Sequence, residues 1–358
     1  MSSILEAERI RVAEWDAQIM DLERALSAAR AQRALIQKRL DSYKYPVLTL
    51  PTEMVSEIFV HFLPVYPECP PFDGILSPTN LTHICRKWRE VALATPRLWR
   101  AIRFCFPPQL DAFDLWLGRS GCCPISVGIG PYESLTRPRF SSSRCARWEH
   151  LRLESPILIE SAMPLLRHLK IEFGDDYSFN PVLFRDVPLL QSVFLNHYAA
   201  ISVTLPWAQL TSVVLDTMYP FECAPILQQT SNLTHCKLML AHLRRSGLPD
   251  ITLPRLESLT VIGCNNSAGT PSAIVGYLDT FIVPALRGLD ILEEYLEDPV
   301  HSLTTLISKS GCRPQKVSIL GNRRVSKDTY CGAFPAIQFS FDGRCGLDEI
   351  VSPNVEAL

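Results

Sequence analysis

A segment of one form, Pro-x-Leu-x-x-apolar-x-apolar, recurs along this chain and limits the folds that the chain can adopt. The last positions of each copy alternate between apolar and polar residues, as in a β-strand that buries one face. One copy has too little apolar surface to form a core alone. The copies are therefore expected to stack, with each strand pairing with the next in a parallel sheet. The four clearest copies are PLLRHLKI at 164–171, PLLQSVFL at 188–195, PRLESLTV at 254–261 and PALRGLDI at 284–291.

Weaker copies fill the intervals between these four and extend the repeat in both directions. Consecutive copies end as little as 18 residues apart, at Leu153 and Ile171, and as much as 30 apart, at Val261 and Ile291. This spacing is typical of proteins in which each repeat supplies one strand and one connection. The weaker copies are WEHLRL ending at Leu153, WAQLTSVVL ending at Leu215, NLTHCKL ending at Leu238 and PQKVSI ending at Ile319.

The stretch LESLTVIGCN carries a longer pattern, with Leu256, Leu259 and Val261 followed by Cys264. In this respect the chain resembles the leucine-rich-repeat family, whose units have the form Leu-x-x-Leu-x-Leu-x-x-Cys. The resemblance implies that residues 104–358 form a curved α/β solenoid with a parallel sheet. Helical connections are expected at 112–121, 224–232 and 303–311, and a closing strand is expected at Ile337, Phe339 and Phe341.

Residues 46–103 carry a second pattern, that of short amphipathic helices with one shared apolar face. The first helix is expected to start near Leu50, because Pro51 and Glu53 suit a helix N-terminus. A second helix is expected after Ser77, a candidate N-cap, and the proline of Thr95-Pro96 ends the run. The apolar positions on these helices are Val55, Ile58, Phe59, Phe62, Leu81, Ile84, Cys85, Trp88 and Ala92.

At these residues the chain resembles the F-box family, in particular the fungal F-box-like type, whose members begin with Leu-Pro and end with Cys-Arg-x-Trp-Arg and Leu-Trp. The resemblance implies a small all-α domain that docks a Skp-type adaptor. An ordinary helical hairpin without an adaptor is the alternative. The proline-rich insert 64–78 is longer than the compact motif allows, and it is expected to be an exposed loop. The residues that match the family, and that would contact the adaptor or shape the contact, are Leu50, Pro51, Glu53, Val55, Ile58, Phe59, Leu63, Ile84, Cys85, Trp88, Leu98 and Trp99.

The N-terminal segment 1–45 is expected to form one long helix, because residues 4–42 contain no proline or glycine and their apolar residues fit a heptad register. Glu8 and Arg33 occupy positions of the heptad seam and interrupt it. Two interpretations remain open: the helix pairs with a second copy in a homodimer, or it folds back on the rest of the chain. The other seam positions are Leu5, Val12, Trp15, Ile19, Leu22, Leu26, Ala29, Ile36 and Leu40.

The charge balance limits the partners that this chain can bind. With 35 Lys and Arg against 37 Asp and Glu, the formal net charge is −2, which offers no excess of cations for nucleic acid or an anionic membrane. No run of about 18 apolar residues indicates a membrane span. The 12 cysteines are spread singly, and most are expected to be small buried hydrophobes. The expected location is the cytoplasm or the nucleus.

The sequence carries few signs of chemistry. It contains no HExxH, no CxxC pair, no phosphate-binding GxxxxGK[ST] and no GxSxG. We therefore expect no catalytic activity, no cofactor and no metal. The adjacent acids Glu293 and Glu294 are interpreted as part of a solvated surface.

The alternation along each repeat strand predicts which side chains face away from the core. Leu169 and Ile171 are expected to point inward, so their polar neighbours point outward. Phe194, Val214 and Met239, together with Ile262, would then form an exposed apolar stripe that suits a protein partner. Two alternatives are a strand register that is wrong by one residue and a C-terminal tail that covers the stripe. The candidate substrate-binding residues are His168, Lys170, Phe194, Asn196, Val214, Asp216, Lys237, Met239, Thr260 and Ile262.

The sequence thus predicts an α+β protein with a long N-terminal helix, a small all-α F-box domain over 46–103 and a repeat solenoid over 104–358. The F-box resemblance implies a subunit that links an unknown protein substrate to a cullin-RING ubiquitin ligase through the Skp-type adaptor. The alternative is a repeat scaffold that binds proteins without a ligase.

Overall fold

The computed structural model describes residues 2–42, 46–104, 110–131, 140, 142–155, 161–175, 182–184, 186–241, 248–263 and 276–342. The fold is mixed α/β, with a long N-terminal helix and a large parallel sheet. The chain divides into two compact units, Met1–Ile58 and Phe59–Leu358. Cys264 and the C-terminal tail, which the sequence analysis singled out, lie outside the described residues.

The first unit consists of the N-terminal helix and the start of the helical segment that resembles an F-box. Helix α1 (Ser2–Ser42) confirms the predicted long helix, and all of its described side chains are exposed. A short 3-10 helix, η1 (Pro46–Thr49), precedes helix α2 (Thr52–Phe62), which crosses into the second unit. Glu53 lies in the first turn of α2, where its charge favours the helix dipole.

The second predicted helix is two helices in the structure, α3 (Pro78–Ile84) and α4 (Arg86–Leu93). Ser77 caps α3 as predicted, with its hydroxyl accepting from the backbone N–H of Thr79 at 3.3 Å. The chain then breaks at Cys85, whose backbone is extended and whose Sγ accepts from Trp88 N at 3.5 Å. Helix α4 ends before Thr95-Pro96 as predicted, and a 3-10 helix, η2 (Pro96–Trp99), follows.

The second unit is built on a sheet of 11 strands in the order β1-β2-β3-β4-β6-β8-β9-β11-β13-β14-β15, and every neighbouring pair is parallel. All eight segments predicted as repeat strands are strands of this sheet. Strands β1 and β2 precede them, and β15 follows them as the predicted closing strand. The strands are β1 (Ala101–Phe104), β2 (Ile125–Ile129), β3 (Trp148–Leu153), β4 (His168–Ile171), β6 (Ser192–Asn196), β8 (Ser212–Met218), β9 (His235–Leu240), β11 (Ser258–Gly263), β13 (Gly288–Leu292), β14 (Lys316–Leu320) and β15 (Gln338–Asp342).

The core of this unit consists of two rows of buried apolar side chains that cross the strands in register. Because side chains alternate between the two faces of a strand, residues two apart share the buried face. Leu169 and Ile171 of β4 lie in these rows, which confirms the predicted direction of the alternation. One row is Val127, Leu151, Leu169, Val193, Val213, Cys236, Leu259, Leu289 and Val317, and the other is Ile129, Leu153, Ile171, Leu195, Leu215, Leu238, Val261, Ile291 and Ile319.

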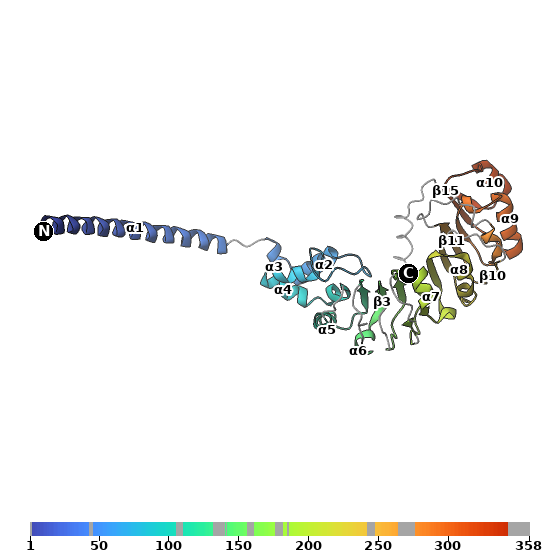
Figure 1. Ribbon diagram of the computed structural model, residues 1–358, viewed down its shortest axis with the longest axis horizontal. Helices are drawn as coiled ribbons and strands as arrows, with labels where there is room; N and C mark the ends of the chain where they lie inside the picture. The colour runs from blue at the N-terminus through green and yellow to red at the C-terminus, as the bar shows by residue number, and fades with distance from the viewer. Residues whose placement is uncertain are drawn as a thin grey trace. The chain divides into compact units, whose positions relative to one another are not determined.

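The connections between strands carry helices, and Figure 1 shows α7, α8 and α9 along one side of the sheet. Two two-stranded parallel sheets lie in these connections. Helix α9 ends at Gly311, whose positive φ of 64° provides the expected glycine C-cap. The helices are α5 (Leu110–Arg119), α6 (Ser142–Cys145), α7 (His197–Ser202), α8 (Pro220–Leu227), α9 (Pro299–Ser310) and α10 (Lys327–Ala333), with 3-10 helices η3 (Trp207–Gln209), η4 (Tyr277–Thr280) and η5 (Glu293–Tyr295), and the short strands are β5 (Val182–Leu183), β7 (Val203–Thr204), β10 (Ile251–Thr252) and β12 (Phe281–Ile282).

Two expectations about the connections are wrong. Helix α8 starts at Pro220 and not at 224, because the Glu222 carboxylate accepts from the backbone N–H of Tyr219 at 3.2 Å and so caps an earlier first turn. Glu293 is buried, not solvated. Its carboxylate accepts from the backbone N–H of Val325 at 3.2 Å and from the Tyr330 hydroxyl at 2.7 Å, which compensates for its loss of water.

Candidate functional site

The residues that match the F-box pattern in the first unit divide into buried and exposed side chains. Val55 of α2 is buried, whereas Ile58 is 50% exposed. Pro51 and Glu53 are exposed and Leu50 is half-buried. The exposed members can contact a partner directly, and Val55 can only shape the helix that presents them.

In the second unit, Leu98 and Trp99 are core residues. The Trp99 indole N–H donates to the Ala92 carbonyl at 2.8 Å, and its ring meets the Trp116 ring of α5 edge-on at 4.9 Å. The Arg119 guanidinium lies over the Trp99 ring at 4.5 Å. Trp99 therefore links α4 to α5, the helix between β1 and β2.

The remaining pattern residues pack around α4. The Phe59 and Trp88 rings are in edge contact at 4.9 Å, and Phe59 is buried. Leu63 and Cys85 are half-buried. Ile84 is 59% exposed at the end of α3, because the chain breaks at Cys85 and turns this side chain away from the buried face. Ile84 is therefore the matched residue of the second unit that offers the most apolar surface to a partner.

The proline-rich insert is not the freely exposed loop that its composition predicts, because it lies against the first strands of the sheet. Pro71 forms a parallel bridge with Arg103 of β1, and the Arg103 N–H donates to the Pro70 carbonyl at 3.0 Å. The Ser126 hydroxyl of β2 donates to the Pro67 carbonyl at 2.6 Å. These contacts explain why all five residues of β2 are buried.

Tyr66 of the insert extends this cover to β3. Its hydroxyl donates to the Glu149 carboxylate at 2.8 Å, and the Arg100 guanidinium lies over its ring at 3.8 Å. Burial and the bond to Glu149 raise the Tyr66 pKa, so the hydroxyl stays protonated. The Tyr66 ring also meets the His150 ring edge-on at 5.2 Å. Through Tyr66 the insert thus contacts His150, which forms a pair with His168.

His150 of β3 and His168 of β4 occupy adjacent strand positions, and their rings stack at 4.4 Å with 7° between the planes. Burial, with smaller contributions from His168 and Arg100, lowers the pKa of His150 to about 3. Burial also lowers the pKa of His168, although Glu149 opposes this shift. Both rings are therefore neutral at physiological pH, and this part of the sheet face is uncharged and aromatic.

Next to the histidines, the open face of the sheet carries a network of ion pairs across three strands. Arg152 of β3 contacts Glu154 at 3.0 Å and Glu172 at 3.1 Å. Arg103 of β1 holds the same Glu154 at 2.8 Å, and Lys170 of β4 holds Glu172 at 3.2 Å. Of these residues, Lys170 was predicted from the sequence to face outward, whereas Arg103 and Arg152 were not predicted. The alternation in WEHLRL could have predicted that Arg152 faces outward, because it lies between two buried leucines, Leu151 and Leu153, on the same strand.

On strands β6, β8 and β9, which follow the ion-pair network along the sheet, the candidate residues carry fewer charges. The Lys170 ammonium lies over the Phe194 ring at 4.3 Å, so Phe194 joins the ion pairs to the apolar residues. Val214 and Met239 are half-buried, as is Lys237, which lies in register with Val214 and Thr260. This cluster presents both apolar and cationic groups.

Two candidate residues have structural roles that their position in the repeat did not reveal. The Asn196 side chain accepts from the N–H groups of Phe173 at 3.2 Å and Ala199 at 3.1 Å, and therefore caps α7. Ile262 is only 3% exposed, so the expected apolar stripe does not include it. At the next residue, Gly263, the Tyr295 hydroxyl of η5 occupies the space that a Cβ would need.

Asp216, Lys237 and Thr260 lie on three successive strands of the sheet, β8, β9 and β11. Burial raises the pKa of Asp216, and the Thr217 hydroxyl donates to its carboxylate at 3.0 Å. Burial lowers the pKa of Lys237, whereas Asp216 and Asp290 raise it. Thr260 donates to Asp290 at 3.1 Å. Carboxylates and an ammonium therefore alternate across β8, β9 and β13, which favours a partner with charges of both signs.

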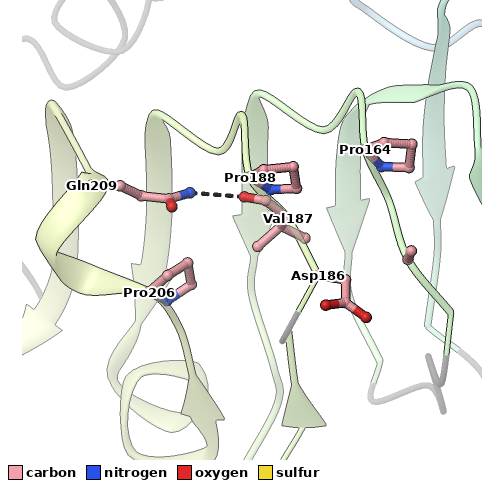
Figure 2. A pocket seen from close by; sticks show the side chains of 7 residues that line it. Pro164, Asp186, Val187, Pro188, Pro206 and Gln209 are labelled. Atoms are coloured by element: carbon pink, nitrogen blue, oxygen red, sulfur yellow. Dashed lines mark hydrogen bonds between the residues drawn. The ribbon is translucent and has the colours of Figure 1, made fainter.

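A shallow hollow of about 400 Å³ lies where the chain enters the strands, at the opposite end from the ion pairs' carboxylates. Figure 2 shows Pro164, Pro188 and Pro206 at its wall, each from a successive repeat. The Gln209 amide donates to the carbonyls of Val187 at 2.7 Å and Leu190 at 3.0 Å, so it ties the turns together. The wall thus provides little free polar chemistry for a ligand.

The described residues contain no group of three or more His, Cys, Asp or Glu side chains that could hold a metal ion. No helix in the described part of the chain is long and apolar enough to cross a membrane. Burial raises the pKa values of Cys145 and Cys223 to about 12, so these cysteines behave as the small buried hydrophobes that the sequence predicted. No protein-family model and no curated protein matches this chain.

Proposed function

We propose that this protein is the substrate-recognition subunit of a Skp-cullin-F-box type ubiquitin ligase. The observation that carries the proposal is the ordered set of residues from Leu50-Pro51 to Leu98-Trp99, which resembles an F-box and lies on short helices directly before a repeat sheet. The exposed side chains of Ile58 and Ile84 support the proposal, because large apolar side chains on short helices suit an adaptor contact. The resemblance to leucine-rich repeats extends to the parallel sheet, which we interpret as a solenoid.

The chemistry of such a subunit belongs to its partners. A receptor that holds a protein substrate near a charged conjugating enzyme raises the effective concentration of the substrate lysine, and needs no catalytic group of its own. The open face of the sheet, with Phe194, Val214, Lys237 and Met239, is the surface that we assign to the substrate. The insert contacts β1, β2 and β3 and leaves Arg103 and Arg152 partly exposed, so we assign to the substrate the part of the face that starts at β4.

The test is a titration of the full-length chain with a purified Skp-type adaptor. Replacing Leu50 and Pro51 together by alanine should cost about 2 kcal/mol, roughly thirtyfold in the dissociation constant. Ile58→Glu is a cleaner probe than Trp88 or Trp99, because a half-exposed side chain contributes less to folding than a buried one.

The matched control is Ile75→Glu, which places the same charge on an isoleucine of the insert that is 82% exposed. It should leave the adaptor affinity unchanged. If the wild-type chain does not bind the adaptor, or if Ile58→Glu and Ile75→Glu bind it equally well, the proposal fails. A repeat scaffold without a ligase then becomes the better description.

A further inference from the structure

Helix α1 presents a long seam of exposed apolar side chains. Of the twelve large apolar side chains exposed on α1, eight fall on the heptad seam. Each of the eight is at least 51% exposed. A helix that is about 60 Å long at 1.5 Å per residue can bury such a seam along most of its length only against another helix. The eight are Leu5, Val12, Trp15, Ile19, Leu22, Leu26, Ile36 and Leu40.

The charges of α1 are divided between its two halves. Residues 6–23 contain six acids and two arginines, a net charge of −4. Residues 24–41 contain five cations and one acid, a net charge of +4. The helix as a whole is neutral, so it has no general attraction for an anionic lipid surface or a polyanion. Its best electrostatic complement is the same helix running in the opposite direction.

We propose that α1 binds α1 of a second copy of this chain as an antiparallel two-stranded coiled coil. In the register that we infer, each seam residue from Leu5 to Ile36 faces the residue whose number adds to its own to give 41. Arg33 of one copy then faces Glu8 of the other, and the two charges that interrupt the seam become partners. The remaining layers are apolar: Leu5 with Ile36, Val12 with Ala29, Leu26 with Trp15 and Ile19 with Leu22.

The parallel arrangement is less favourable for the same residues. In a parallel pair each seam residue faces its own copy, so Arg33 meets Arg33 and Glu8 meets Glu8 inside a partly dehydrated interface. The antiparallel register does bring like charges near each other on one flank, where Arg9 approaches Arg30. That flank is open to water, which screens its charges more strongly than those at the seam. The seam pairs therefore decide the orientation.

The experiment measures dimer dissociation of the full-length chain by sedimentation equilibrium. The wild-type chain should dimerise. Glu8→Arg and Arg33→Glu should each raise the dissociation constant roughly thirtyfold, because two seam layers per dimer change from attraction to repulsion. The double variant Glu8→Arg/Arg33→Glu should return to within about threefold of wild type, since it restores both pairs with their signs exchanged.

Glu14→Arg and Lys38→Glu are the matched controls, because they make the same charge changes away from the seam. Each should change the dissociation constant less than about threefold. A parallel coil predicts no loss in either single variant, because like charges face each other before and after the change. Equal affinities for the single variants and wild type would therefore overturn the antiparallel assignment, and a monomeric wild-type chain at 100 µM would overturn the pairing itself.

A distance measurement tests the orientation without changing the seam. The test introduces a nitroxide amino acid at Ala34 of both copies. In the antiparallel register, Ala34 of one copy lies opposite residue 7 of the other, 27 residues from the second label, so the two labels are about 40 Å apart. In a parallel pair the two labels lie within about 20 Å. Electron–electron resonance on the full-length dimer distinguishes these values. The inference does not depend on the proposed ligase function, since adaptor binding and dimerisation are measured separately.

Discussion

Burial of the stacked histidine pair should make the folded protein less stable at mildly acidic pH than at neutral pH. The pKa of His150 is lowered to about 3 in the folded chain, because the ring is buried beneath Tyr66 and beside His168. In the unfolded chain a histidine has a pKa of about 6.5. The unfolded chain therefore binds a proton at this residue between pH 6.5 and 3, and the folded chain does not. The stabilisation from neutral His150 is complete above pH 6.5 and is lost as the pH falls toward 3.

The size of the effect follows from the difference between the two pKa values. Each pH unit below 6.5 costs about 1.4 kcal/mol, so the loss at pH 5 reaches about 2 kcal/mol for a fully enclosed ring. Solvent reaches part of the His150 ring, so we expect about 1 to 2 kcal/mol. The lowered pKa of His168 changes stability in the same direction.

The measurement is urea unfolding of the wild-type chain and of His150→Phe at pH 7 and pH 5. Phenylalanine keeps a ring against Tyr66 and His168 but does not titrate at this position. Between pH 7 and pH 5, the variant should lose about 1 to 2 kcal/mol less unfolding free energy than wild type. His301→Gln, on the exposed side of α9, is the control and should follow wild type. Identical losses in wild type and His150→Phe would refute the argument that the ring is held neutral by burial.

Two further substitutions test the packing of the C-terminal repeats. Glu293→Gln should lower the free energy of unfolding by about 2 to 4 kcal/mol, because the buried carboxylate accepts from Val325 N–H and the Tyr330 hydroxyl without access to water. Thermal unfolding measures this loss. A loss as small as that of Glu294→Gln would contradict the buried role of Glu293. Gly263→Ala should cost about 1 to 3 kcal/mol, because the Tyr295 hydroxyl occupies the position of the new methyl group. Tyr295→Phe in the same chain should recover part of that loss, and a double-mutant cycle without coupling would show that the close approach is unimportant.

The sheet was predictable because its signals are local. Each repeat strand carries its own alternation and its own leading Pro or polar turn, so β4, β6, β11 and β13 can be read from eight residues at a time. The same locality explains the long helix over α1, where no residue interrupts the helical pattern. In these segments, the chain neighbours of a residue determine its conformation.

The errors arose where a specific contact outside the repeat or helical pattern decides the outcome. Cys85 continues a helical apolar pattern, yet its side chain caps the following helix and splits the predicted element in two. Glu293 is followed by a second acid, which suggests solvent, but backbone N–H groups more than thirty residues later enclose it. Ile262 fits the outward side of its strand, yet it is buried, and Tyr295 of the next connection closely approaches the neighbouring Gly263. The periodicity of apolar residues in the sequence does not predict such contacts.

The insert between α2 and α3 shows most clearly how composition alone can mispredict exposure. Its attachment to the sheet uses the carbonyl groups of Pro67 and Pro70, which every residue type could provide, and prolines in a loop usually indicate exposure. Its side-chain contacts include those of Tyr66, which reaches Glu149 and His150, and of Cys69, whose Sγ lies 3.2 Å from the Ser126 hydroxyl. The insert contacts β1 to β3 and leaves Arg103 and Arg152 partly exposed, so it narrows the open face at these strands, and we assign the partner to β4 to β9. The extra residues in the motif therefore set one boundary of the substrate surface that we propose.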